Sequence, residues 1–190
     1  ELRFIPTLDP YDPRVPGWIE AFVDDYTRQG LKTHVLHLPG RTGTLGAAAM
    51  VCTGEEMSRQ FAAQGLAPQA VFLAAGSGLT VAGLVLAFKA LGLATRVVGI
   101  SVQKPAAFMV PLIVERANAA AALLGLSTRV DAGDFDFDDG HIGTAYGVPS
   151  QGSVDAIQFA GSREGLVLDP VYSGKAFAGM LAQLRAGRWP

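Results

Sequence analysis

A glycine-rich turn near the middle of the chain carries the residues best suited to hold an anion. The segment "FLAAGSGLTVAGL", residues 72–84, places Gly76, Ser77 and Gly78 between a short apolar run and an alanine-rich helical pattern. A turn from a strand into a helix exposes backbone N–H groups at the positive end of the helix dipole, where phosphate binds well. The glycines allow close approach of a ligand, and Ser77 and Thr80 add hydroxyl donors. The pattern favours a phosphate-binding turn; a tight turn that binds nothing is the alternative.

Two common phosphate motifs do not match this turn. A dinucleotide-binding fingerprint needs a third glycine where the chain has Val81, and an acidic residue about twenty positions further on, where "VVGISV" has none. A P-loop needs a lysine directly after its glycines, and no lysine follows here. A smaller phosphate-bearing cofactor therefore fits better than NAD or ATP.

Strands alternate with helices along the chain. The apolar periodicity and the Gly and Pro positions predict helices over residues 18–30, 47–65, 79–91, 108–124, 153–160 and 176–186, and strands over 2–5, 33–38, 70–74 and 96–102, with a last strand just after Glu164. This alternation predicts an α/β fold with an open, mostly parallel sheet and helices on both faces. Ligands of such sheets bind outside the carboxyl ends of the strands, where the turn lies. Residues 39–46 are expected to form a glycine-rich loop.

Composition and charge narrow the classes of protein and partner. The 190 residues are 49% hydrophobic and 17% charged, with a net charge of −2, which is typical of a well-buried globular chain. The chain has no block of Lys and Arg and no apolar run of ~20 residues, so we expect neither nucleic acid nor a membrane as partner. The single cysteine, Cys52, excludes an internal disulfide and favours a cytoplasmic location. The abrupt ends of the sequence are expected of a piece of a longer chain.

Two longer segments resemble a known enzyme family. The segment "AAGSGLTVAGLVLAFKALGLATRVVGISV" is similar to the phosphate-loop region of the fold type II pyridoxal-phosphate enzymes, the tryptophan synthase β-chain relatives. The segment "AYGVPSQGSVDAIQFAGSREGLVLDPVYSGKAFAGM" resembles the branch of D-cysteine desulfhydrase and 1-aminocyclopropane-1-carboxylate deaminase. In that branch a Y-G-[LV]-P segment, here Tyr146–Pro149, precedes a D-P-V-Y-x-G-K segment, here Asp169–Lys175. The resemblance extends over about residues 2–190.

The resemblance implies a cofactor, a domain organisation and a set of site residues. Residues 1–40 would end a small domain, and residues 41–190 would form most of the large domain that binds pyridoxal 5'-phosphate. The cofactor phosphate would be held by Gly76, Ser77, Gly78, Leu79 and Thr80. Tyr146 and Tyr172 would line the active site, with Tyr172 a candidate for proton transfer or nucleophilic assistance at the substrate. Plain packing of both tyrosines is the alternative.

The residue after Tyr172 bears on the substrate. Deaminase members of the branch typically carry Glu at this position, near the pyridine ring, whereas desulfhydrase-like members carry a small hydroxyl residue, as Ser173 is here. The resemblance thus implies that Ser173 is a cofactor-binding residue. The resemblance therefore favours a carbon–sulfur lyase that converts D-cysteine to pyruvate, sulfide and ammonia. Deamination of 1-aminocyclopropane-1-carboxylate is the alternative. A small amino-acid substrate, a homodimeric full-length protein and a cytoplasmic location are implied with it.

The sequence also departs from the family pattern. These enzymes hold the cofactor covalently on a lysine that follows an Asn, and none of the four lysines here, at positions 32, 89, 104 and 175, follows an Asn. Lys89 is expected to be solvated, and Lys175 to have a structural or capping role. The chain alone is therefore expected to be inactive. A non-catalytic module that binds phosphate or a nucleotide through the same turn stays open as a function of another class.

Metal sites are not predicted. His34 and His37 lie three apart in an expected strand and so face opposite sides of it. The acidic run "DFDFDDG", residues 134–140, lacks the Gly at position six and the Glu at position twelve of an EF-hand loop. It is expected to be a solvated acidic loop.

Overall fold

A computed structural model describes residues 2–7, 9, 11–36 and 41–189, and it divides the chain into two compact units. The first unit spans residues 1–36 and the second spans residues 37–190. The assignment of these parts to the end of a small domain and most of a large domain stays a prediction.

The first unit is built around one helix, α1, at Val15–Arg28. Arg3 ties the preceding segment to this helix: its guanidinium lies 4.6 Å from the ring centre of Tyr26 and makes a 2.6 Å ion pair with Asp25. The described residues 2–7 and 31–36 contain no strand, so the strands expected there are wrong over these residues. A strand needs a neighbouring strand for its backbone hydrogen bonds, and the described part of this unit supplies only a helix.

The second unit contains a parallel sheet in the order β1-β2-β3. Its strands are Ala70–Ala75 (β1), Arg96–Ser101 (β2) and Asp136–Asp138 (β3), and Ala75 pairs with Ser101 in the register of β1 and β2. The expected strands over 70–74 and 96–102 are confirmed. The strand expected after Glu164 is wrong: the segment is irregular, and Val167 within it is 98% exposed.

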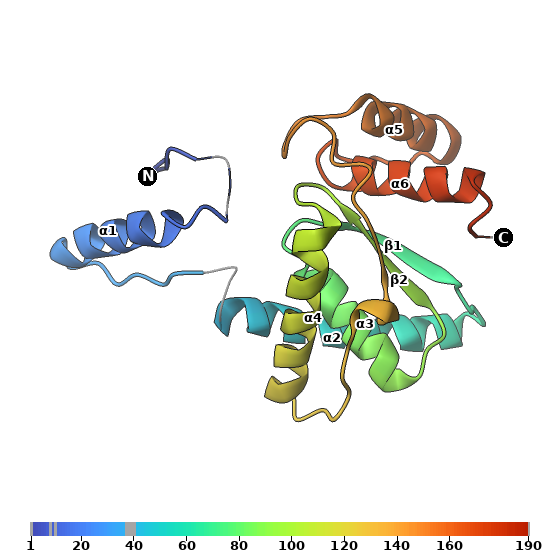
Figure 1. The fold of residues 1–190 in the computed structure, drawn as a ribbon, viewed down its shortest axis with the longest axis horizontal. Coiled ribbons are helices and arrows are strands. Elements are labelled where there is room, and N and C mark those ends of the chain that lie inside the picture. Colours follow the sequence, from blue (N-terminus) through green and yellow to red (C-terminus); the bar gives the residue numbers. More distant parts are fainter. Residues whose placement is uncertain (1, 8, 10, 37–40, 190) are drawn as a thin grey trace. The chain divides into compact units, whose positions relative to one another are not determined.

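Helices cover both faces of this sheet (Figure 1). On one face lie α2 (Arg41–Ala63), α3 (Leu79–Leu91) and α4 (Ala106–Leu123), and on the other lie α5 (Gln151–Glu164) and α6 (Ser173–Arg185). Alternate residues of the strands explain the two layers: Val97 packs into the core of the first face, and Val98 and Ile100 into the core of the second. The predicted α/β fold is confirmed.

Close packing of α2 on α3 corrects one prediction. Residues 41–46 were expected in a glycine-rich loop, but they form the first turns of α2; residues 39 and 40 lie outside the described part. Here the small residues allow α2 and α3 to pack closely, and they do not form a turn. A Cβ at Gly83 of α3 would lie 2.4 Å from the carbonyl oxygen of Ala47, so the two backbones meet without a side chain between them.

Among the described helices, α4 alone is long and apolar enough to cross a membrane by length and composition. Core helices of soluble proteins pass the same test, so this is weak evidence for a span. Met109, Ile113 and Ala117 of α4 are fully buried in the core against α3. The absence of a membrane partner stays a prediction.

Candidate functional site

The glycine-rich turn connects β1 to α3 at the carboxyl end of the sheet. β1 ends at Ala75, and Gly78 is the N-cap of α3 with φ +78°, a left-handed conformation that favours glycine. No side chain caps this helix, so the first turn of α3 offers its backbone N–H groups to a ligand. Leu79 and the exposed Thr80 begin the helix. All five residues expected to hold a phosphate thus lie in this turn or in the first turn of α3.

Side chains behind the turn bind its carbonyl groups. Gln103 Nε2 donates to Gly76 O at 2.9 Å, and Arg116 Nη1 donates to Ser77 O. Arg116 is 5% exposed and comes from α4. These contacts engage the negative ends of two peptide dipoles and place a cation close to the turn. Neither donor stood out from sequence, although a single Arg in the apolar helix "LIVERANAAAA" was an available signal.

The space at the turn is too small for a side chain at Gly78 and tight for one at Gly76. A Cβ at Gly78 would lie 2.7 Å from Ile113 Cγ1, and one at Gly76 would lie 3.3 Å from Tyr172 Cε1. Backbone donors, an uncapped helix N-terminus and a nearby guanidinium together form a donor set suited to a dianionic phosphate. The residues present therefore fit the phosphate group of the cofactor that the sequence implies.

The two predicted catalytic tyrosines meet next to this turn. Tyr172 precedes α6 and Tyr146 lies in the segment before α5, 26 residues away, yet their hydroxyl groups are hydrogen-bonded. Their rings are edge to face, with centres 6.1 Å apart. The hydrogen bond with Tyr146, together with partial burial, raises the pKa of Tyr172 to about 12. The Tyr172 phenol is therefore protonated at neutral pH, and either hydroxyl of the pair can donate the hydrogen bond between them.

Asp169 organises the backbone that presents Tyr172. Its carboxylate accepts hydrogen bonds from the N–H groups of Val171, Tyr172 and Ser173, each at 2.8 Å. Partial burial acts to raise the pKa of Asp169, but the hydrogen bonds from Ser173 and its neighbours outweigh burial and hold it well below its ordinary value. Sequence reasoning did not single out Asp169, although an Asp-Pro pair before a helix is a recognised turn and cap signal.

Ser173 also takes part in the hydrogen bonds of Asp169 at the start of α6. Its hydroxyl donates to Asp169 Oδ1 at 2.6 Å and accepts from the Asp169 N–H at 2.8 Å. Ser173 and Tyr172 also line a largely apolar cavity of about 260 Å³ between β1 and α6, together with Phe72, Ala74, Phe177 and Met180. The structure thus places Ser173 beside the predicted site with its hydroxyl directed to Asp169.

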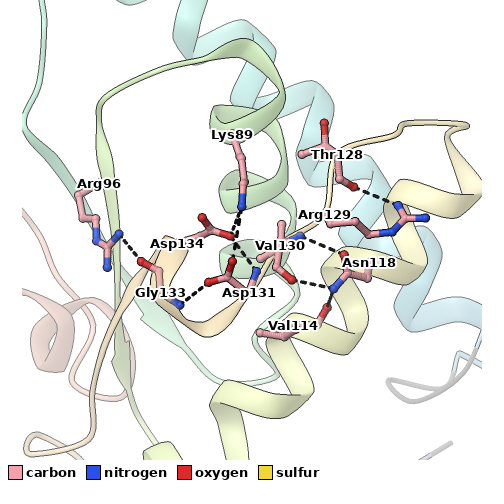
Figure 2. Close-up of polar contacts among 10 residues, drawn as sticks. All are labelled: Lys89, Arg96, Val114, Asn118, Thr128, Arg129, Val130, Asp131, Gly133 and Asp134. Atoms are coloured by element: carbon pink, nitrogen blue, oxygen red, sulfur yellow. Dashed lines mark hydrogen bonds and ion pairs between the residues drawn. The ribbon is translucent and has the colours of Figure 1, made fainter.

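The acidic run 134–140 takes no part in this site. Lys89 pairs with Asp134 at 2.6 Å, and Arg96 donates to Gly133 O (Figure 2). Arg96 also donates to Asp136 Oδ1 at 2.9 Å. Arg96 begins β2, so the network lies at the end of the sheet opposite the glycine turn. The expectation of a solvated loop is wrong, because residues 136–138 form β3 and these carboxylates have partners. Lys89 is exposed, as expected, and its ammonium pairs with Asp134 at the surface.

A metal centre finds no support in the described residues. Within them, no group of three or more His, Cys, Asp or Glu side chains is placed to hold a metal ion. His34 is exposed, and His37 lies outside the described residues, so their predicted separation on a strand has no counterpart here.

The chain matches known proteins of one enzyme family. Residues 19–190 match the model of the family described as pyridoxal-phosphate dependent enzyme. Enzymes named 1-aminocyclopropane-1-carboxylate deaminase from Ralstonia nicotianae and Ralstonia pickettii are 31% and 30% identical over 175 residues, which are 92% of this chain and 52% of each relative. The chain thus spans about half the length of these curated relatives.

A solved structure shares the fold. The crystal structure of a protein titled an ACC deaminase homologue superposes with a TM-score of 0.84 and 30% identity, over 99% of this chain and 55% of that one. This match confirms the fold type II architecture, and the family model implies pyridoxal phosphate as the cofactor. From its glycine turn, its tyrosine pair and these matches, we conclude that the chain belongs to the family of pyridoxal-phosphate dependent enzymes.

Proposed function

We propose that this chain supplies the phosphate-holding turn and the tyrosine pair of a lyase or deaminase that acts on a small amino acid. The observation that carries the proposal is the closeness of the Tyr172 ring to Gly76, where an added Cβ would lie 3.3 Å from Tyr172 Cε1, because it puts a phenol next to an uncapped helix N-terminus. Pyridoxal phosphate, when bound, supplies an electron-withdrawing ring that stabilises negative charge at the substrate carbon. The residues of this chain would bind and orient that group and hold a proton beside it.

Each part of the site has its own role in this proposal. The N–H groups of residues 77–80 hold the phosphate, while Arg116 adds positive charge and fixes the Ser77 carbonyl group away from it. Tyr172 holds its proton at the phenol oxygen and gives it, or a hydrogen bond, to the substrate. Tyr146 orients that phenol through their shared hydrogen bond.

D-Cysteine is the first candidate substrate. Ser173 supports it, because this position carries a neutral hydroxyl bound to Asp169 and no carboxylate of its own. The products would be pyruvate, sulfide and ammonia. 1-Aminocyclopropane-1-carboxylate is equally well supported, because the curated relatives are named as its deaminases. The two substrates should be assayed side by side on this chain and on the complete natural gene product, and release of sulfide from D-cysteine would decide for the first.

The chain alone should bind the cofactor without a covalent bond. The four lysines are not in the family's Asn-Lys context, and Lys175 is buried and engaged with backbone carbonyl groups. Borohydride treatment with pyridoxal phosphate should therefore leave no specific lysine label. We further propose, from the family resemblance, a homodimeric and cytoplasmic complete protein.

Titration of the 15N-labelled chain tests the phosphate role directly. Pyridoxal phosphate should shift the amide resonances of residues 76–80, and pyridoxal, which lacks the phosphate, should not. Shifts caused by ADP alone would support the nucleotide-binding alternative. An unresponsive turn with all three compounds would contradict the proposed function.

A further inference from the structure

Lys175 is a fully buried cation whose contacts are to backbone carbonyl groups. It lies in the first turn of α6, three residues after Tyr172, with 0% of its surface exposed. Its ammonium donates to Ile142 O at 2.6 Å and to Ala145 O at 3.4 Å. Within the described residues no carboxylate contacts it. Burial accordingly lowers the pKa of Lys175.

Packing alone does not account for this lysine. An ammonium group is costly to remove from water unless it is well paired, and lysine is almost never fully buried without a partner charge. A leucine or methionine would fill similar space without the desolvation cost. What a lysine adds is a set of N–H donors that reach two carbonyl groups of another segment.

That other segment carries Tyr146. Ile142 and Ala145 lie just before it, and residues 143–149 are all exposed, so little burial holds them in place. The hydrogen bonds that join α6 to residues 142–149 in the described structure are the two from Lys175 and the one between the tyrosine hydroxyls. Tyr172 is the N-cap of α6 and Lys175 lies in its first turn, so one short stretch of chain carries Tyr172 and also binds the segment of Tyr146.

We propose that Lys175 is a positioning residue that holds residues 142–145 against α6, so that the Tyr146 hydroxyl reaches the Tyr172 hydroxyl. Its importance for catalysis rests on the proposed function, in which this pair donates a proton to the substrate. The role needs the donor hydrogens of the ammonium group, and the aliphatic part of the side chain serves only as the spacer.

The test follows the tyrosine resonances of the 190-residue chain labelled with 13C at tyrosine Cζ, whose chemical shift responds to hydrogen bonding of the phenol. Tyr146→Phe and Tyr172→Phe assign the two resonances and show where each lies without its partner. Lys175→Met keeps the length and apolar volume but removes the donors. We expect Lys175→Met to move the Tyr172 resonance to its position in Tyr146→Phe, and the Tyr146 resonance to its position in Tyr172→Phe.

Gln183→Met is the matched control. Gln183 is another buried polar residue of α6, 4% exposed, and it bonds Asp138 and Trp189 instead of the Tyr146 segment. This variant should lower the free energy of unfolding but leave both tyrosine resonances in place. A folded Lys175→Met protein with wild-type tyrosine resonances would overturn the proposal, as would equal shifts in Gln183→Met. If Lys175→Met does not fold, Lys175→Leu, which also lacks donors, is judged by the same criterion.

The outcome is separable from that of the proposed function. The amide resonances of residues 76–80 report cofactor binding in the same samples, whereas the tyrosine resonances report the pair without any cofactor. A turn that fails to bind pyridoxal phosphate, with a pair that responds to Lys175→Met, removes the function and keeps the positioning role. If the turn binds pyridoxal phosphate but the tyrosine pair does not respond to Lys175→Met, the proposed function is kept and the positioning role is removed.

Discussion

The carboxylate of Asp169 accepts four hydrogen bonds at the start of α6, three from backbone N–H groups and one from the Ser173 hydroxyl. Removal of a cap of this kind costs about 1–2 kcal/mol, so Asp169→Ala should lower the free energy of unfolding by about that amount. Tyr172 should lose its fixed backbone as well. Urea denaturation of the two proteins at pH 7 measures the difference.

The same variant carries a pH dependence whose sign is fixed. The pKa of Asp169 in the folded chain lies below its ordinary value of 3.8, so its ionised form stabilises the folded state above that pH. The contribution is lost as the pH falls from about 4 toward the folded-state pKa. The difference in free energy of unfolding between wild type and Asp169→Ala should therefore shrink between pH 5 and pH 3. A constant difference across that range would contradict the role of the charge.

Gly78 is the position of the turn that tolerates an added side chain least. In Gly78→Ala the alanine would have to adopt a left-handed φ of +78°, and its Cβ would lie 2.7 Å from Ile113 Cγ1. Strain of about 1–2 kcal/mol from the backbone adds to an overpacking cost of about 1–3 kcal/mol. Gly92→Ala is the control: its φ is +69°, but nothing lies within 4 Å of its Cβ. Gly78→Ala should be the less stable of the two by urea denaturation, and it alone should lose cofactor-induced shifts.

At the scale of elements, the contact of α2 with α3 makes a similar prediction. Alanine at Gly83 would gain helix propensity of about 1 kcal/mol, but its Cβ would lie 2.4 Å from a backbone oxygen, which cannot move without moving α2. We expect Gly83→Ala to lower the free energy of unfolding by about 1–3 kcal/mol. Gly161→Ala in α5, whose Cβ would lie 3.7 Å from the nearest atom, should raise it by about 0.5–1 kcal/mol. If urea denaturation shows that Gly83→Ala and Gly161→Ala change the free energy of unfolding in the same direction, this account is wrong.

Sequence patterns correctly predicted the helices and strands that bury an apolar face. They failed for segments whose structure depends on a neighbouring strand or helix. The expected helix over 79–91 matches α3, and the strands β1 and β2 were located to within one residue, because their apolar runs and flanking glycines are local signals. The first unit was expected to contain strands, but a strand depends on a neighbour that its own sequence does not encode. Residues 41–46 were misjudged because Gly43 and Gly46, which indicate a loop by propensity, lie on a helix that packs closely.

Part of the candidate site was equally accessible from sequence. The turn and the tyrosines were found through their motifs, and the structure brings Gly76, Tyr146 and Tyr172 together. Arg116, which supports them, was missed, and for Lys175 only a structural or capping role was expected, without its partners. Both bind backbone carbonyl groups of segments at least 30 residues away, and such contacts leave no local pattern. Burial of a cation becomes visible only once the fold is known.

At the scale of the whole molecule, the site joins segments that are far apart in the second unit, so its occupation should stabilise that unit as a whole. A ligand that binds the folded state alone adds RT ln(1 + [L]/Kd), which is about 2.7 kcal/mol at one hundred times Kd. Pyridoxal phosphate at that level should raise the free energy of unfolding by this amount, whereas pyridoxal should have little effect. Trp189 reports the unit, because its ring packs edge to face on Phe72 of β1 and its N–H donates to Gln183 of α6.

The measurement is urea denaturation followed by tryptophan fluorescence in a Trp18→Phe background, which leaves Trp189 as the sole fluorescent tryptophan of the chain. The proposal places the phosphate at the turn before α3, whereas Trp189 packs against β1 and α6. A raised midpoint at Trp189 would therefore mean that the turn and the tyrosine-bearing layer unfold together. Gly78→Ala should abolish the effect of pyridoxal phosphate, because the left-handed φ and the clash with Ile113 would distort the backbone of the turn. Stabilisation that survives Gly78→Ala would show that the ligand binds elsewhere, and the glycine turn would then lose its assignment as the phosphate site.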